Sequence, residues 1–205
     1  MPLSSVVGAQ SIIKPGVCTS STRPAVPFEG QMIYETDTDV LAVWNGSAWR
    51  YIVATTPTNG AVLQVVTATK TDTFSTTNTA SFVDVTGLSV SITPKSSSSK
   101  VFVTFHISNG NAGANHNMYN LVRDSTNLAQ PAAAAYSSTA GSSHIGGDQD
   151  FKTVSFSHLD SPSSTSSITY KIQAKTSGAT LYVNRRGDTA IVSSSSSITV
   201  MEIAG

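Results

Sequence analysis

The chain has 205 residues, and its 12 Lys and Arg residues balance its 12 Asp and Glu residues, so the formal net charge is zero. Charged residues make up only 12% of the chain, about half of the roughly 25% that is usual for a soluble domain, whereas Ser and Thr are abundant. The chain has no cluster of Lys and Arg residues, which argues against nucleic-acid binding. No stretch approaches the roughly 18 apolar residues of a membrane span. The single cysteine, Cys18, excludes an intrachain disulfide, and the N-terminus lacks the charged start of a signal peptide.

Residues 1–27 are predicted to form an extended N-terminal anchor. Pro2, Pro15, Pro24 and Pro27 interrupt any continuous helix or strand in this segment. The segment also offers few bulky side chains to bury, so it cannot form a core of its own. We therefore expect a partner to hold it.

Residues 28–56 are predicted to form a small β-meander. Strands are expected at 32–34, 40–44 and 49–53, and Asn45-Gly46 between the last two is a strong signal for a type I′ hairpin turn. A segment this short cannot make an independent core, because domains below about 40 residues usually need staples or oligomerisation. Residues 57–61 are expected to form a linker.

Residues 62–205 are predicted to form an antiparallel jelly-roll sandwich, so the fold class is all-β. Alternation is clearest in Val101, Val103, Phe105 and Ile107, and the best helix candidate, at 132–135, would make one or two turns at most. Short strands without helices between them are typical of a sandwich, and the jelly roll suits their number. The expected strands are 62–69, 81–86, 88–93, 100–107, 117–123, 150–158, 168–175, 181–185, 189–192 and 197–203.

The last strand is apolar on both faces. Ile198 and Val200 lie on one face, and Met201 and Ile203 lie on the other. An apolar pattern on both faces predicts that both are buried, one in the sandwich core and the other in a subunit interface. A central strand covered by its own loops would give the same pattern. Candidate interface residues are Met201, Ile203, Phe102 and His106, the last two because they lie off the core face of their strand.

Two motifs resemble proteins of tailed bacteriophages. The stretch from Arg23 to Thr38, with Pro27-Phe28-Glu29-Gly30-Gln31-Met32-Ile33-Tyr34-Glu35-Thr36-Asp37-Thr38 at its centre, followed by Trp44-Asn45-Gly46-Ser47-Ala48-Trp49, is similar to a short module of phage structural proteins. The ending Ser196–Ile203 resembles the last strand of phage fibre heads, which are similar to the trimeric jelly rolls of the tumour-necrosis-factor and complement-head type. The resemblance implies a homotrimer in the virion, anchored through residues 1–27 on another virion protein, with its heads outward.

The leading hypothesis is therefore a trimeric fibre or spike that attaches a phage to a host surface glycan or protein. Neither nucleic-acid binding nor membrane insertion is expected. The alternative is a capsid decoration or cement protein without a receptor. Loops at 109–117, 129–150 and 161–167 are the candidate contact regions, because binding residues concentrate on loops of a rigid scaffold. Candidate receptor-facing residues are Asn111, Asn115, His144 and Asp148.

No motif indicates an enzyme, a cofactor or a metal. The chain lacks a GxSxG elbow, a phosphate loop and a GxGxxG turn. Neither Asp37-x-Asp39 nor Asp148-x-Asp150 provides enough ligands for a calcium loop, and the former is expected to form a turn. Metal-ligand spacing is also missing among the four histidines, His106, His116, His144 and His158.

Two short motifs are explained by turns. Arg186-Gly187-Asp188 matches the integrin-binding tripeptide, but Gly-Asp also suits a turn between two expected strands. Asn45-Gly46-Ser47 matches a glycosylation acceptor, and the hairpin turn accounts for it.

Overall fold

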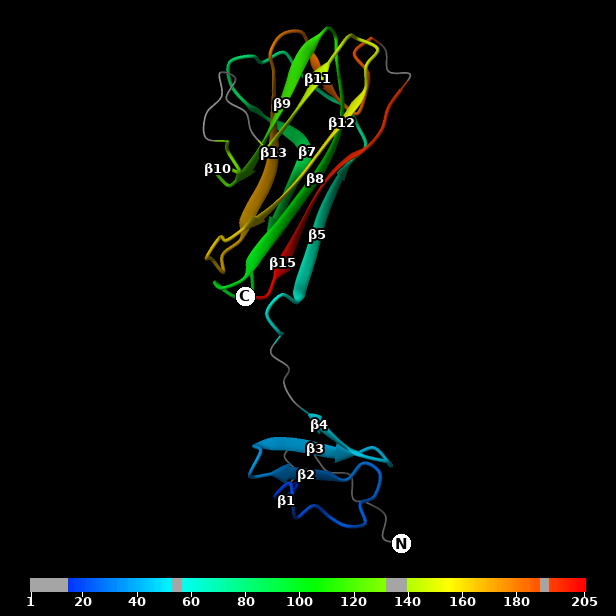
Figure 1. Cartoon of the computed structure of the whole chain (residues 1–205), viewed down its shortest axis with the longest axis vertical. Helices are drawn as coiled ribbons and strands as arrows, with labels where there is room; N and C mark the ends of the chain where they lie inside the picture. The colour runs from blue at the N-terminus through cyan, green and yellow to red at the C-terminus, as the bar shows by residue number, and fades with distance from the viewer. Residues whose placement is uncertain (1–14, 53–56, 132–139, 189–191) are drawn as a thin grey trace, which may run out of the picture. The chain divides into compact units, whose positions relative to one another are not determined.

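The computed structural model describes residues 15–52, 57–131, 140–188 and 192–205. The chain divides into two compact units, Met1–Thr56 and Pro57–Gly205 (Figure 1). Every regular element in the described ranges is a β-strand, which confirms the predicted all-β class. The helix candidate at 132–135 and most of the strand expected at 189–192 lie outside the described residues. No helix in the described part of the chain is long and apolar enough to cross a membrane.

The smaller unit is a four-stranded sheet in the order β1-β2-β3-β4. The predicted meander forms three of these strands, and the four residues from Asn45 to Ala48 join the last two. Gly46 has a φ of 91°, but Asn45 does not have a positive φ, so the predicted two-residue type I′ turn is wrong. The fourth strand was not expected, because it lies inside the segment predicted as an anchor without regular elements. It pairs in parallel with the first strand of the meander. The strands are β1 (Gly16–Cys18), β2 (Met32–Glu35), β3 (Val40–Trp44) and β4 (Trp49–Ile52).

One face of the small sheet carries the unit's buried groups. Ile33 and Ala42 are fully buried there, and they are the only fully buried apolar side chains among the described residues of this unit. Glu35 is buried beside them and accepts a hydrogen bond from Arg23 Nε at 2.5 Å, which lowers the pKa of this carboxyl. The indole rings of Trp44 and Trp49 pack edge to face, with centroids 5.6 Å apart.

The larger unit is a jelly roll, as the nested pairing of its strands shows. Leaving aside the short β6 and β14, the first strand pairs with the last, the second with the second-last, and so on inward: β5 with β15, β7 with β13, β8 with β12, and β9 with β10 and β11. This nesting folds the chain into two facing antiparallel sheets. The strands are β5 (Val62–Lys70), β6 (Phe74–Thr76), β7 (Val83–Ile92), β8 (Lys100–Asn111), β9 (Asn115–Arg123), β10 (Thr126–Leu128), β11 (Gly141–Ile145), β12 (Lys152–Asp160), β13 (Ile168–Thr176), β14 (Leu181–Val183) and β15 (Ser196–Ile203).

Several predicted boundaries in this unit are wrong. The two strands expected at 81–86 and 88–93 are a single strand, β7, which passes through Gly87 at a φ of 84° opposite a register shift in β13. A glycine can take this conformation without a steric penalty, so the ladder continues beyond it. The predicted loop at 109–117 is mostly strand, because β8 ends at Asn111 and β9 begins at Asn115. The strands β6, β10 and β11 were not predicted.

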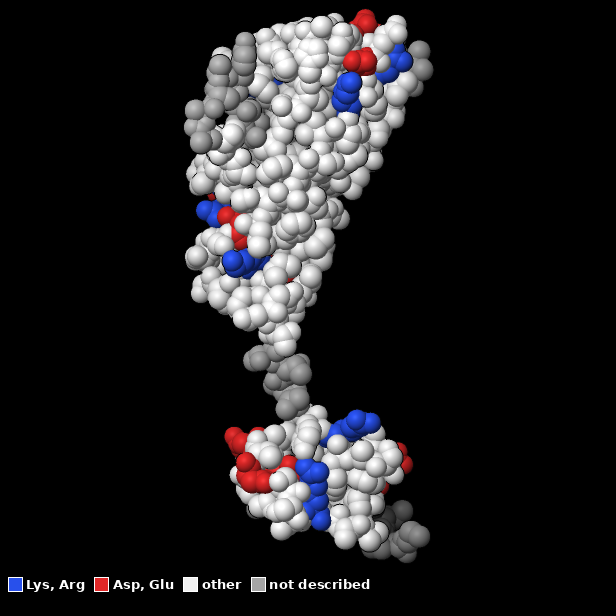
Figure 2. Space-filling model, viewed as in Figure 1, with Lys and Arg blue, Asp and Glu red and all other residues white. Residues whose placement is uncertain are grey.

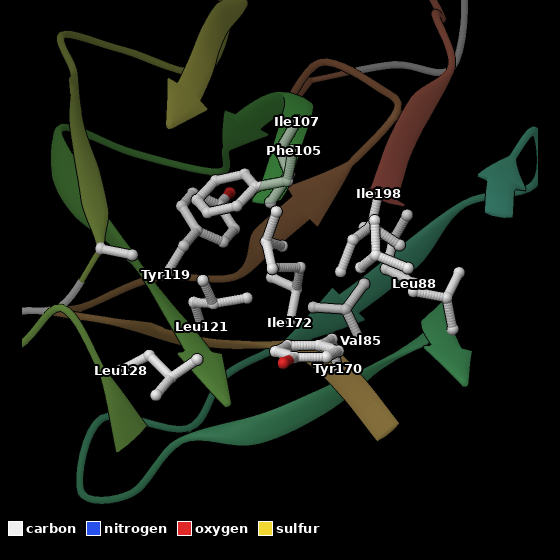
Figure 3. Close-up of a cluster of buried hydrophobic side chains, with 14 of the residues drawn as sticks. Val85, Leu88, Phe105, Ile107, Tyr119, Leu121, Leu128, Tyr170, Ile172 and Ile198 are labelled. Atoms are coloured by element: carbon white, nitrogen blue, oxygen red, sulfur yellow. The ribbon is translucent and has the colours of Figure 1, made fainter. Parts of the chain in front are cut away.

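The core lies between the two sheets. Phe105 and Ile107 of β8 face Tyr119, Leu121 and Ile172 of the opposite sheet (Figure 3). At one edge of this core the buried Asp160 accepts two hydrogen bonds from Arg123 and one from the Tyr170 hydroxyl. Together with burial, that last bond raises the pKa of Tyr170, so the phenol stays protonated as the donor.

Candidate self-association face and binding loops

The outward face of the sheet that contains β15 carries an apolar row across four strands. Leu159 of β12 lies opposite Phe102 of β8, Phe102 lies opposite Met201 of β15, and Met201 lies opposite Val65 of β5. Successive side chains of a strand point to opposite faces, so partners in register share a face. The inward neighbours of these residues, such as Val103 and Val200, are fully buried in the core.

Half of this row is open to solvent. Leu159 is 50% exposed and Val65 is 55% exposed, and Phe102 and Met201 between them are half-buried. Val62, which is also 55% exposed, lies opposite Ile203 next to the row. Single exposed apolar residues are ordinary, whereas contiguous exposed apolar groups are a feature of many interaction surfaces.

Hydroxyl groups occupy the next rows of the same face. Thr104, Thr199 and Thr67 lie side by side in register, and the Thr67 and Thr199 hydroxyls are 2.9 Å apart. His106, Ser197 and Thr69 follow in the next row. Among the residues of β5, β15, β8 and β12 that point to this face, Lys100, at one end of β8, is the only Lys, Arg, Asp or Glu. On the neighbouring β14, the centroid of the Tyr182 ring lies 4.2 Å from the Arg185 guanidinium. Apposing two copies along β5, β15, β8 and β12 would therefore force few like charges together.

All four predicted interface residues lie on this face. Phe102 and Met201 are direct cross-strand partners, Ile203 is opposite Lys100, and His106 is opposite Ser197. The sequence reasoning missed Val65 and Leu159, which complete the apolar row. Their signal was weak, because β5 mixes polar and apolar residues and Leu159 is the only bulky aliphatic residue near the end of β12.

The predicted receptor-facing residues have different environments. Asn111 is fully buried in β8, where its side-chain NH₂ donates to Asn117 Oδ1 at 2.7 Å and to Thr176 Oγ1 at 3.0 Å. Its assignment to an exposed loop is therefore wrong. Asn115 is half-buried at the start of β9, whereas His144 in β11 and Asp148 in the following loop are exposed.

Buried asparagines link the two sheets at this end of the sandwich. Asn117 of β9 donates to Asn109 Oδ1 at 2.8 Å and to the Gly110 carbonyl at 3.0 Å, and Ser143 Oγ also donates to Asn109 Oδ1. Each buried amide therefore has partners, which offsets the cost of its desolvation. The network gives the loops above it a fixed base.

The exposed histidines His116 and His144 form a cross-strand pair with ring centroids 4.7 Å apart. Within the ranges that the structure describes, no three His, Cys, Asp or Glu side chains converge as ligands for a metal ion. The two rings make an edge-to-face contact between β9 and β11.

The Arg-Gly-Asp tripeptide is packed against the protein. Arg186 forms an ion pair with Asp188 at 2.6 Å, and the backbone N–H groups of Gly187 and Asp188 both donate to the Asp148 carbonyl. A Cβ at position 187 would lie 1.9 Å from the Asn111 carbonyl oxygen. This close approach explains the glycine without a ligand.

In the smaller unit, the polar residues Asn45, Asp37 and Asp39 make hydrogen bonds within or next to turns. Asn45 Oδ1 accepts hydrogen bonds from the backbone N–H groups of Ser47 and Ala48, as in an Asx turn. Asp37 accepts hydrogen bonds from Ser20, which lower the pKa of its carboxyl, and Asp39 accepts one from the Tyr34 hydroxyl.

Comparison with known proteins gives distant structural likenesses. No protein-family model matches the chain, and no curated protein matches its sequence. The structure of infectious bursal disease virus Gt strain is 13% identical, with a TM-score of 0.40, over 80% of this chain and 44% of that chain. The VP2 subviral particle of the same virus is 15% identical, with a TM-score of 0.35, over 89% of this chain and 46% of that one. The chain thus spans less than half the length of these viral chains, and likeness at this level transfers no function from them.

Proposed function

We propose that this protein is a structural component of a tailed-phage virion, a homotrimeric fibre or spike that attaches the particle to its host. The phage-like module at residues 23–49 and the jelly-roll head support this assignment. In this role the head is adhesive, and it needs neither a catalytic group nor a cofactor.

The observation that carries the proposal is the apolar row Leu159–Phe102–Met201–Val65 on an almost uncharged sheet face. Burying a face of this composition against another protein surface lowers the free energy, because apolar side chains leave water. A closed ring of identical heads would cover the face of each copy and leave no unpaired surface.

The anchor belongs to the smaller unit. Val26 is 90% exposed and Phe28 is 69% exposed, so the segment around them offers apolar side chains to another virion protein. Removing all of residues 1–27 would also remove β1 and Arg23, the ion-pair partner of the buried Glu35. Replacing Val26 and Phe28 by Asp leaves β1 and Arg23 in place and is therefore the cleaner test of anchoring: the trimer should form but be absent from particles.

Attachment by the heads would be multivalent. Three heads on each fibre and many fibres on each particle convert weak single contacts into firm attachment through high effective concentration. Of the predicted contact residues, His144 and Asp148 are exposed and Asn115 is half-buried, so all three are accessible to a host surface glycan or protein.

Analytical ultracentrifugation of the full chain tests the trimer. We expect three copies in one particle at micromolar concentration, and a stable monomer would overturn the proposal. Immunogold labelling of intact particles then tests the location. Label confined to the tail supports a fibre, whereas label across the head would favour a capsid decoration protein and remove the host-attachment role.

A further inference from the structure

We infer that the smaller unit has its own self-association face, which packs against a second copy of the same unit. The inference rests on the proposed trimer and adds an interface separate from that of the heads. It comes from the face of the β1–β4 sheet that is opposite Ile33, Ala42 and Glu35.

This face carries an apolar row that spans the whole sheet. Val17 of β1 lies opposite Tyr34, Tyr34 lies opposite Leu41, and Leu41 lies opposite Ile52 of β4. Val17 is 70% exposed and Ile52 is 54% exposed, at the two edges of the sheet. In the described structure, the row therefore presents apolar surface from edge to edge, and Met32 and Val43 continue it into the next row.

The unit needs additional burial to be stable. Ile33 and Ala42 are its only fully buried apolar side chains among the described residues, and a core of two side chains is far below what a free domain requires. Covering the open face would add Leu41, Tyr34 and Ile52 to the buried surface. A partner on this face therefore contributes stability that the unit lacks by itself.

The charges at the ends of the face favour a second copy as that partner. Arg50 is exposed and lies opposite Val43, on one side of the apolar row. Asp39 is exposed on the other side, next to Val40, and accepts a hydrogen bond from Tyr34. A positive charge therefore lies on one side of the apolar row and a negative charge on the other. Two copies of this face can pair these opposite charges, whereas a partner that carries charges of one sign only would meet a like charge.

The chain also provides the local concentration for such packing. Few residues separate Ile52 of β4 from Val62 of β5, so joining three heads would hold three small units close together. Weak contacts between them would then form intramolecularly, at an effective concentration in the millimolar range for a short linker.

Photo-crosslinking in the full chain tests the inference directly. A photoreactive amino acid would replace Ile52, and the matched control would carry it at Ser47, which is exposed in the loop between β3 and β4 and lies outside the row. We expect covalent dimers and trimers at position 52 at a several-fold higher yield than at position 47. No interchain product at position 52, or a product mapped to residues 1–14 of the same chain, would overturn the inference.

Tryptophan fluorescence gives a second measurement, because the chain's two tryptophans, Trp44 and Trp49, both lie in this unit. Ile52→Arg should lower the denaturant midpoint of the tryptophan signal in the trimer, and Ser47→Arg, in the exposed loop between β3 and β4, should not. In a Met201→Lys background, where the heads are separate, Ile52→Arg should have little further effect. An equal loss in both backgrounds, or no loss in either, would contradict a second copy on this face.

The two proposals fail in different ways. If the wild-type chain sediments as a trimer but position 52 gives no interchain product, only the second interface is wrong. If the wild-type chain is a monomer, the fibre proposal is wrong, and this inference falls with it.

Discussion

The head exposes two sheet faces that differ in their side chains. The face of β5, β15, β8 and β12 carries the apolar row and rows of hydroxyls. The opposite outer face, on β7 and β13, carries Asp84, which accepts hydrogen bonds from Lys171 at 2.8 Å and Gln173 at 2.7 Å, and a Ser91–Thr169 hydroxyl contact of 2.9 Å. Figure 2 shows that charged groups on the visible side of this unit gather in separate places and leave broad uncharged surface between them.

The difference indicates which face would lose more free energy of hydration if a partner covered it. Polar groups of the β7–β13 face already have partners, and their side chains remain partly solvated, so covering them would require desolvation. Covering the apolar row would instead remove Leu159, Phe102, Met201 and Val65 from water at no such cost. The two outer faces of the sandwich therefore differ in how much desolvation of paired polar groups a partner would require.

Met201→Lys, on the face with the apolar row, should have the largest effect and dissociate the trimer. If the apolar row is an interface, the substitution places an unpaired charge there in every copy, and a buried unpaired charge costs about 3–5 kcal/mol. We expect folded monomers, measured by sedimentation together with far-UV circular dichroism.

The matched control is Ser91→Lys on the β7–β13 face, where Ser91 is exposed. It should leave the trimer unchanged, and it should cost little stability, because the Ser91–Thr169 hydroxyl contact that it removes is exposed. Unfolded or aggregated Met201→Lys chains would mean that Met201 belongs to the core, and an unaffected trimer would mean that the row is solvent-exposed in the assembly.

Glu202→Gln separates the stability of the head from the stability of the trimer, because Glu202 follows Met201 but points into the sandwich. Its carboxylate is fully buried and accepts hydrogen bonds from Gln64 at 2.6 Å and the Lys95 backbone N–H at 2.7 Å. Burial by itself would raise the pKa of Glu202, but the hydrogen bonds outweigh it and lower the pKa below its ordinary value. Hydrogen bonds to a charged group contribute about 1.5–3 kcal/mol, so the variant should lose that much stability at pH 7 without losing the trimer.

The pH dependence follows from the lowered pKa. The unfolded chain binds the proton more readily than the folded one, so this stabilisation is present above the ordinary pKa of Glu, about 4.3, and is lost as the pH falls through the folded value. Urea unfolding at pH 7 and pH 3, followed by circular dichroism, should show the difference between wild type and Glu202→Gln shrinking at the lower pH. A constant difference would mean that the charge of Glu202 is not what the hydrogen bonds stabilise.

The strands with strong alternation could be predicted from the sequence. In β8, Val101, Val103, Phe105 and Ile107 alternate with Phe102, Thr104 and His106, and the structure buries the first set in the core. The strands β10 and β11 could not be found in this way. Residues such as Gly141, Ser142 and Ser143 have little strand propensity, and they form a strand because β9 offers them an edge to pair with.

The asparagines show a second limit of sequence reasoning. Asn109, Asn111 and Asn117 read as turn residues, because Asn and Gly are the commonest turn formers. They are buried because their amides satisfy one another across the sheets, and a single sequence does not reveal that pairing. By contrast, Phe102 and Met201 were identified as surface candidates because each is a bulky apolar residue on the non-core face of a strand with clear alternation.

Asp84→Asn should have the smallest effect and sets the scale for the other variants. Asp84 is 53% exposed and Lys171 is 26% exposed, and solvated ion pairs contribute only about 0.2–1 kcal/mol. The hydrogen bond from Lys171 lowers the pKa of Asp84, so the small loss should be present at pH 7 and vanish in strong acid and at high salt. Sedimentation should show an unchanged trimer. If Asp84→Asn instead dissociated the trimer while Met201→Lys did not, the ion-paired face would be the interface, and the roles of the two faces would be reversed.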